Sequence, residues 1–171
     1  FFSDKETGLR AIVAVHNSNL GPGAGGCRIW HYDSFDDALT DVLRLSKGMS
    51  YKSALAGLDC GGGKSVIIAD SRMPREQKDK LMRAFARHIQ TLGGRYWAAE
   101  DVGTSVEDAR VMMQECDYIF GLPDGSGDPS PFTARGVYES MRAAVKFKLG
   151  RDDLKGIKVA VQGVGHVGYY L

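Results

Sequence analysis

The sequence has no marked excess of charge of either sign and no long hydrophobic run. The formal net charge is +1 over 171 residues, so we expect neither nucleic acid nor an anionic membrane surface as a partner. No apolar stretch approaches the length of a membrane span. Because 43% of the residues are hydrophobic, a packed core can form, and we expect a soluble globular protein of one domain, or of one domain and part of another.

Cysteine is scarce, and spacings typical of metal ligands are missing. The three cysteines, Cys27, Cys60 and Cys116, are odd in number and far apart, which is typical of reduced thiols in a cytoplasmic enzyme and not of a disulfide framework. No CxxC and no His/Cys pair has metal-ligand spacing, so we expect no metal. The sequence also lacks an initial Met and a signal peptide, and it stops just after a glycine motif that should open a helix. We therefore expect a fragment, or a chain that lacks both ends.

Strand patterns and helix patterns alternate along the chain. Apolar runs predict strands at residues 9–15, 66–69, 96–99, 117–120 and 157–161. Helical spacing and capping residues predict helices after Ser34, from Pro74 to Gly93, after Ser105, and from Thr133 to Leu149. This order predicts an α/β fold with a mostly parallel sheet flanked by helices. The stretch 121–131, dense in Pro, Gly, Asp and Ser, predicts a hinge, and we expect one domain at 1–132 and the start of a second at 133–171.

The stretch GGGKS, Gly61 to Ser65, suggests a loop that binds the phosphates of a nucleotide. A P-loop requires a further Gly five positions before the Gly-Lys pair, because its glycine backbone closes around the phosphates. That position is Leu58, so the pattern fails. The run Val66 to Ile68 after the lysine also predicts a strand, where a P-loop would open a helix.

Two lysines and a carboxylate are candidates for proton chemistry. A lysine between glycines and an apolar strand can lose its hydration, and a second ammonium nearby would make it a base near neutral pH, which suggests Lys64 with Lys52. The alternative is that both are surface lysines, and their spacing alone favours that alternative. Asp101 follows the strand predicted at 96–99, where open α/β sheets place functional groups, although it can also serve only to cap a turn.

Two glycine-rich segments remain. The run VAVQGVGHVG contains a predicted strand followed by GxGxxG, in which Gly163, Gly165 and Gly168 allow a tight turn, close approach of a pyrophosphate and close helix packing. The alternative is an ordinary glycine-rich turn in an α/β core. The segment 21–26 is either a nest of backbone N–H groups that binds an anion or a flexible loop.

Five blocks, in this order, resemble the glutamate/leucine/phenylalanine/valine dehydrogenase family, and most closely its branched-chain and aromatic branch. The blocks are LGPGAGGCR, LRLSKGMSYKSALAGLDCGGGKSVII, AAEDVGTS, GDPSPFTARG and VAVQGVGHVG, and they cover nearly the whole chain. The resemblance implies a domain for substrate binding, catalysis and oligomerisation, followed by the truncated start of a Rossmann domain. It also implies NAD-dependent oxidative deamination of an apolar L-amino acid to a 2-oxo acid and ammonia, in a homo-oligomer.

The resemblance also implies roles for single residues. Lys52 would hold the substrate α-carboxylate, with the backbone of Gly25 and Gly26 lining the same region. Lys64 would activate the water that attacks the imine, and Asp101 would exchange protons with the amino group. On the cofactor side, NAD would contact Thr133 and the residues of the glycine turn, which are Gly163, Gly165, His166, Val167 and Gly168.

The residue at position 24 narrows the range of possible substrates. The resemblance implies that enzymes of the glutamate branch carry a lysine at this position, which binds the side-chain carboxylate of the substrate. With Ala24 in its place, the acidic side chain of a glutamate substrate would be buried without a partner, at a cost of several kcal/mol. The leucine enzymes usually have a bulkier residue at this position, so Ala24 favours a larger substrate, whereas Ala99 resembles the leucine branch. Leucine, valine and phenylalanine stay open as substrates. Two alternatives to this function remain. One is a non-catalytic binding or assembly domain of the same fold, and the other, less favoured, is a glutamate dehydrogenase.

Overall fold

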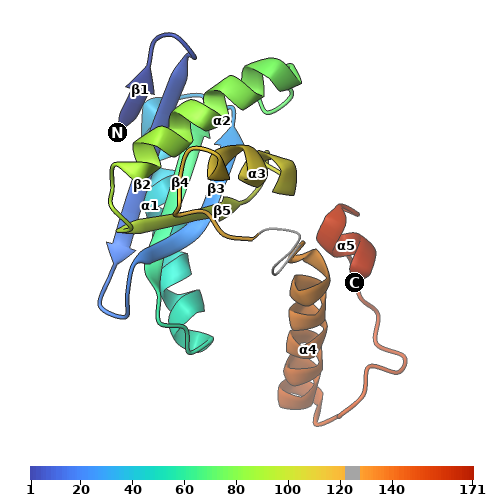
Figure 1. Ribbon diagram of the computed structural model, residues 1–171. Coiled ribbons are helices and arrows are strands. Elements are labelled where there is room, and N and C mark those ends of the chain that lie inside the picture. Colours follow the sequence, from blue (N-terminus) through green and yellow to red (C-terminus); the bar gives the residue numbers. More distant parts are fainter. Residues whose placement is uncertain (122–127) are drawn as a thin grey trace. The chain divides into compact units, whose positions relative to one another are not determined.

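A computed structural model describes residues 1–121 and 128–171 (Figure 1). It contains two compact units, Phe1–Gly125 and Ser126–Leu171, which are described separately below. Most of the segment in which we predicted a hinge lies outside the described residues. The boundary at residue 132 therefore stays a prediction.

The first unit is built on a mixed five-stranded sheet. In spatial order the strands are β1 (Phe2–Asp4), β2 (Leu9–Asn17), β4 (Gly61–Ile68), β3 (Gly23–Trp30) and β5 (Tyr96–Glu100). The pairs β3–β4 and β3–β5 are parallel, as expected, while the hairpin of β1 and β2 adds two antiparallel pairings. The predicted α/β class, with a sheet flanked by helices, is confirmed, but the expectation of a mostly parallel sheet was wrong, since two of the four pairs of neighbouring strands are antiparallel.

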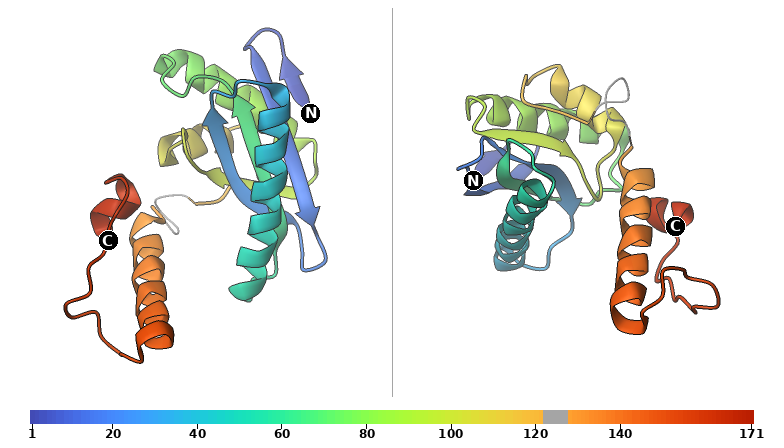
Figure 2. Two further views of the ribbon diagram at one scale, coloured as in Figure 1. Left: turned by 180° about the vertical axis from the view of Figure 1, so that it is seen from behind. Right: turned by 90° about the horizontal axis from the view of Figure 1, so that it is seen from below.

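Three helices cover this sheet on its two faces. Helix α1 (Phe35–Leu55) lies on one face, and α2 (Arg75–Gln90) and α3 (Val106–Met113) lie on the other (Figures 1 and 2). The chain passes from β3 to its neighbour β4 through α1, and then back across β3 to β5 through α2. Because both crossovers of an α/β unit are right-handed, this reversal of direction puts α1 and α2 on opposite faces. It also creates a topological switch point between β3 and β5, where ligands of open α/β sheets bind.

The helix starts predicted from capping residues are confirmed. The Ser34 side chain accepts a hydrogen bond from the backbone N–H of Asp37 at the start of α1, and Ser105 and Asp108 form a reciprocal capping box at the start of α3. Asp108 is fully buried and also pairs with Arg75 and Lys78 of α2. This cap therefore fastens α3 to α2.

The core follows the alternation of the strands. One cluster lies between the sheet and the pair α2 and α3, and it includes Leu9, Ile29, Phe85 and Tyr96. A smaller cluster on the α1 face consists of Ile12, Ala38, Val42 and Val66. Successive residues of β2 and β4 thus point to opposite faces, as the pleat of a strand requires.

Two predictions about where strands form in the first unit were wrong. Residues 21–26 were read as an anion nest or a flexible loop, but Gly23–Gly26 form the buried start of the central strand β3. Glycine lowers strand propensity in general, and here close packing of neighbouring backbones compensates for it. The strand predicted at 117–120 is reduced to one bridge, between Ala98 and Ile119.

The second unit contains α4 (Ser130–Leu149) and the short α5 (His166–Tyr170). Helix α4 begins three residues before the predicted start, because Pro131 is tolerated in a first turn, and Gly150 ends it in the left-handed conformation as expected. Residues 157–161 do not form the predicted strand: a strand needs a neighbour to bind its N–H and C=O groups, and the described part of this unit contains none. None of the helices in the described residues has the length and apolar character needed to cross a membrane.

Candidate functional site

Lys64 is a buried cation on the α1 face of the sheet. It lies two residues before Val66 on β4, so both side chains point to the same face, where Val66 packs under α1, and only 5% of Lys64 is exposed. Its Nζ lies 2.9 Å from Oδ1 of Asp101. The alternative of a surface lysine is therefore wrong for Lys64. Its close partner is a carboxylate, where the sequence had suggested a second ammonium.

Asp101 follows the last residue of β5, at the switch point of the sheet. Its second oxygen, Oδ2, accepts a hydrogen bond of 2.9 Å from Nε of Arg28 on β3. Its backbone N–H donates to Oγ1 of Thr104, whose hydroxyl donates to the carbonyl oxygens of Cys27 and of Asp101 itself. Burial raises the pKa of Asp101, but the Lys64 ammonium and the Arg28 guanidinium outweigh it, so the pKa lies below its usual value.

Arg28 extends the pair into a chain of charged and polar groups. Its Nη1 donates to Oδ2 of Asp41 on α1 at 2.9 Å, and the hydroxyl of Tyr32 donates to the same oxygen at 2.7 Å. Burial lowers the pKa of Arg28, but Asp101 and Asp41 raise it more, and the net shift is upward. Groups from β3, β4, β5 and α1 are thus joined in one network.

The glycines around this network allow close approach. A Cβ on Gly26 would lie 2.5 Å from the carbonyl oxygen of Glu100 and 2.7 Å from the Cβ of Asp101. One on Gly25 would strike the carbonyl oxygen of Gly63, and one on Gly62 would strike Ser50 of α1. The glycines of GGGK therefore serve to pack strands and a helix around Lys64.

A cavity of about 430 Å³ lies on the same face of the sheet. Its lining residues are mostly apolar: Pro22, Ala24, Met49, Ser53, Leu58, Cys60, Trp97 and Phe120. Ala24 and Ala99, the two residues expected at the substrate side chain, are both buried, and Ala24 is part of the lining. Lys52 is exposed in the last turn of α1, next to Ser53 and one helical turn from Met49.

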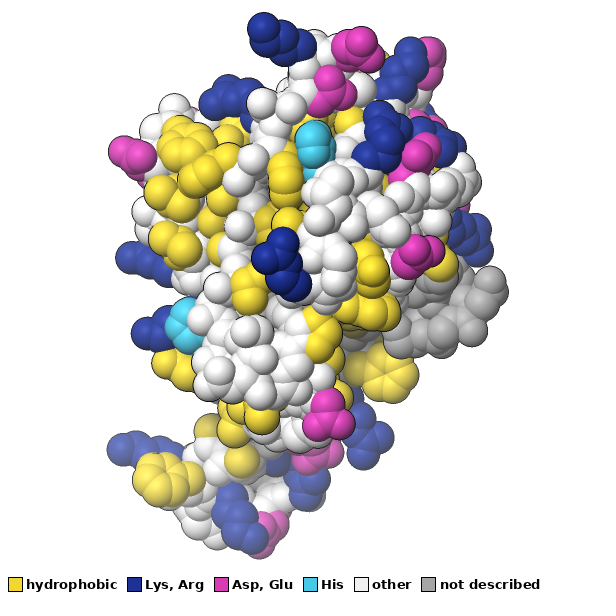
Figure 3. All heavy atoms as spheres, turned by 60° about the vertical axis from the view of Figure 1, so that its left-hand side comes forward, with side chains coloured by type: hydrophobic (Ala, Val, Ile, Leu, Met, Phe, Trp, Pro, Cys, Tyr) yellow, Lys and Arg dark blue, Asp and Glu magenta, His cyan; other side chains and the backbone are white. Residues whose placement is uncertain are grey.

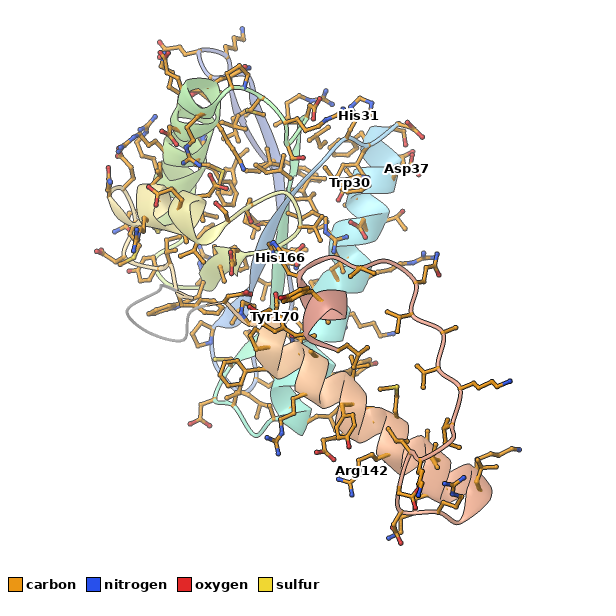
Figure 4. The ribbon with its side chains drawn as sticks, turned by 90° about the vertical axis from the view of Figure 1, so that its right-hand side faces the viewer. Trp30, His31, Asp37, Arg142, His166 and Tyr170 are labelled. Carbon is orange, nitrogen blue, oxygen red and sulfur yellow. The ribbon has the colours of Figure 1, made fainter. Side chains whose placement is uncertain are left out.

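The residues expected to bind the cofactor lie in the second unit. Thr133 is in the first turn of α4, where its hydroxyl donates to the carbonyl oxygen of Pro129. Gly163 has a φ of +83°, and a Cβ on Gly168 would lie 2.5 Å from the carbonyl oxygen of Gly163. Gly165 precedes α5, which begins with His166 and Val167 (Figure 4). Gly163 and Gly168 are thus required by the geometry of the turn itself.

Several residues of the site were not anticipated. Arg28, Asp41 and Tyr32 were passed over, although Arg28 lies two residues after the paired glycines and Asp41 lies next to buried Val42 on α1. Tyr96 was read only as a strand residue. Its buried hydroxyl bonds to Ser65 of β4 and donates to the carbonyl oxygen of Gly25, where β3 and β4 are not directly paired. A polar side chain within a buried apolar pattern is the signal that could have pointed to these groups.

A larger hollow, of about 620 Å³, lies on the other face of the sheet. It lies among the apolar side chains Phe2, Val13 and Val15 and the turn that contains Arg95. Figure 3 shows one side of the molecule, on which hydrophobic side chains gather in patches and both basic and acidic side chains are scattered around them. Among residues 1–121 and 128–171, no cluster of three His, Cys, Asp or Glu side chains has the arrangement of a metal site.

A buried lysine paired with a half-buried carboxylate, on the face of an α/β sheet that also holds an apolar cavity, defines an enzyme-like site suited to proton transfer on a small apolar molecule. Residues 2–118 match the family model of the Glu/Leu/Phe/Val dehydrogenase dimerisation domain. The chain belongs to this family.

Named relatives agree with this assignment. Leucine dehydrogenase of Geobacillus stearothermophilus is 54% identical over 100% of this chain and 47% of its own length. Phenylalanine dehydrogenase of Bacillus thermotolerans is 46% identical over 99% of this chain and 44% of its own length. The crystal structure of L-tryptophan dehydrogenase from Nostoc punctiforme superimposes with a TM-score of 0.72 at 40% identity, over 99% of this chain and 48% of that chain. The chain thus spans about half the length of these proteins.

Proposed function

We propose that this chain is the substrate-binding part of an NAD-dependent dehydrogenase that converts an apolar L-amino acid to its 2-oxo acid and ammonia. The observation that carries the proposal is the ion pair of buried Lys64 and half-buried Asp101, 2.9 Å apart, on the face of the sheet that also holds an apolar cavity. The names of the relatives, which include leucine, phenylalanine and valine dehydrogenases, support the reaction class.

The residues of the first unit divide the work. Lys52, exposed beside the cavity, binds the substrate α-carboxylate next to the backbone of Gly25 and Gly26. The Lys64 ammonium first gives a proton to Asp101, and its neutral amine then takes a proton from the water that attacks the imine carbon. Asp101 exchanges the proton that it received with the departing nitrogen. Because Asp101 touches Lys64, a proton can pass between the two within the site.

The cavity favours an apolar substrate side chain. Its lining includes no Lys, Arg or His, so the side-chain carboxylate of glutamate would be buried without a cation, at a cost of several kcal/mol. Ala24 leaves space beside the aromatic residues Trp97 and Phe120. Leucine, valine and phenylalanine are the substrate classes this lining accommodates.

The second unit would supply the first part of the cofactor domain. The chemistry that NAD would supply there is an acceptor for the hydride of the substrate α-carbon. The turn from Gly163 to Gly168 would hold its pyrophosphate, since these glycines leave the backbone open, and Thr133 would contact the carboxamide. The description of the matched domain as a dimerisation domain supports a homo-oligomer, and three free cysteines support a cytoplasmic protein.

The proposal is tested by Lys64→Ala in the full-length protein. General acid–base catalysis contributes roughly 10²- to 10⁴-fold, so kcat for oxidation of the preferred amino acid should fall by at least about that factor. The matched control is Lys80→Ala, which removes an exposed lysine of α2 that pairs with Glu76 one turn away. Near-normal kcat in a folded Lys64→Ala protein would rule out the assignment, as would a wild-type enzyme that prefers glutamate to leucine, valine and phenylalanine.

A further inference from the structure

Arg28 binds one of the two oxygens of the Asp101 carboxylate. Oδ1 of Asp101 faces Lys64 and Oδ2 faces Nε of Arg28, each at 2.9 Å, so the two cations hold the carboxylate from two different strands. The proposed reaction uses the contact between Asp101 and Lys64 and assigns no role to the contact between Asp101 and Arg28. A carboxylate held by Lys64 alone would be free to rotate and to present either oxygen.

The guanidinium of Arg28 is itself fixed from its other end. Nη1 donates to Asp41 of α1, and Tyr32 donates to the same oxygen of Asp41. Burial, together with this bond, raises the pKa of the Tyr32 phenol, so its hydroxyl remains a donor. Because the guanidinium is planar and rigid, anchoring Nη1 on Asp41 also sets the direction in which Nε–H points.

Arginine suits such a position for a chemical reason. A guanidinium does not give up its proton in proteins, so Arg28 can hold the charge of Asp101 without entering the proton exchange between Asp101 and Lys64. A lysine could exchange protons there, and its single ammonium lacks the fork that contacts two carboxylates at once.

We propose that Arg28 is a positioning residue for Asp101: anchored by Asp41 and Tyr32, it keeps the carboxylate ionised and its Oδ1 turned toward Lys64. The inference rests on the proposed function. Arg28 acts through Asp101 and is not among the residues that line the apolar cavity.

The groups around Asp101 set the expected pH effect. Lys64 faces it from β4 and Arg28 from β3, while Thr104 binds its backbone. Two further titratable groups nearby, Cys27 and Tyr96, have a pKa raised chiefly by burial, which keeps both neutral. Without Arg28, Lys64 is the one cation left in contact with Asp101 among the described residues, so the pKa of Asp101 rises. The acidic limb of the kcat–pH profile then moves to higher pH.

The test is Arg28→Met in the full-length enzyme, with kcat and KM for the amino acid measured as a function of pH. Misplacement of a catalytic group by about 1 Å lowers turnover by about 10²-fold, and we expect a fall in kcat of that order with KM nearly unchanged, because Lys52 and the cavity are intact. The acidic limb should move to higher pH. Arg28→Lys retains the charge, so it should restore the limb toward its wild-type position while kcat recovers only in part.

The control is Arg72→Met, which removes an exposed arginine paired with Asp70 and should leave both kcat and the pH profile as in the wild type. A folded Arg28→Met enzyme with reduced thermal stability but an unchanged pH profile and kcat would overturn the inference, since a merely structural role predicts that result. If Arg28→Met does not fold, Arg28→Lys decides: unchanged kcat overturns the inference, and reduced kcat at unchanged KM supports it. A wild-type enzyme inactive on every apolar amino acid would instead contradict the proposed function itself.

Discussion

At the scale of single residues, the three cysteines should differ sharply in reactivity. Burial raises the pKa of the Cys27 thiol to about 12, in spite of the hydrogen bond with Ser65, and burial also raises the pKa of Cys116. Cys60 is half-buried and lines the apolar cavity. Because the thiolate is the reactive form, we expect a thiol alkylating reagent at neutral pH to modify Cys60 first.

Mass spectrometry of peptides from the briefly alkylated native protein measures this difference. Protein unfolded in urea provides the control, since all three cysteines should then react at similar rates. Modification of Cys27 as fast as that of Cys60 in the native protein would show that the strand pair β3–β4, which buries Cys27, opens readily.

The sequence was sufficient to select Lys64 and Asp101, but their contact and their partners depend on the fold. Whether a lysine is buried depends on a counter-charge that another strand brings to it, and Asp101 is distant in sequence. Arg28 and Asp101 are 73 residues apart, and no local pattern links them. Residue type and spacing therefore identify candidates, whereas the switch point of the sheet decides which of them meet.

At the scale of elements, the contact between α1 and β4 depends on Gly62. A Cβ on this glycine would strike the Ser50 backbone and lie 2.5 Å from the carbonyl oxygen of Ser46, so Gly62→Ala would force helix and strand apart. Overpacking of this kind costs about 1–3 kcal/mol, and we expect a lower urea midpoint of unfolding with an unchanged m value.

Gly48→Ala is the matched control, because Gly48 lies within the same helix and its added Cβ would meet no heavy atom within 4 Å. Alanine is favoured over glycine in a helix interior by about 0.5–1 kcal/mol, so this variant should be more stable than the wild type. If both substitutions raised the midpoint, close packing would not be the reason for a glycine at position 62.

Elements with clear caps or long periodic patterns could be predicted, and those that depend on partners could not. Ser34, Ser105 and Gly150 mark helix ends through local hydrogen bonds or backbone conformation, which a sequence pattern contains. Strand β3 was missed because its glycines are selected by neighbouring backbones and not by strand propensity. The strand predicted at 117–120 did not form, because its apolar residues favour a strand but pair with a neighbouring strand at one bridge only among the described residues.

At the scale of the whole molecule, the two units differ in how completely they bury their own apolar side chains. The first unit has two buried clusters and a five-stranded sheet. In the second unit, the large hydrophobic residues Phe147, Val159 and Val161 are exposed. A domain is stable when apolar surface is buried against another layer, and the described part of the second unit does not provide one. We infer that this unit is completed by further chain in proteins as long as the relatives.

Hydrogen exchange of residues 157–161 tests that inference. These residues form a mostly apolar run but have no strand partner in the described chain, so their amides should exchange nearly as fast as in an unfolded peptide when the 171-residue chain is studied alone. In a full-length protein the same amides should become protected, because neighbouring strands of a cofactor-binding sheet would bind them. Amides of Val66 and Ile67 in β4 serve as the internal reference, since they are buried in the first unit and should be protected in both proteins. Fast exchange at 157–161 in the full-length protein would mean that this segment is not the first strand of a dinucleotide-binding domain, and that the turn from Gly163 to Gly168 has another use.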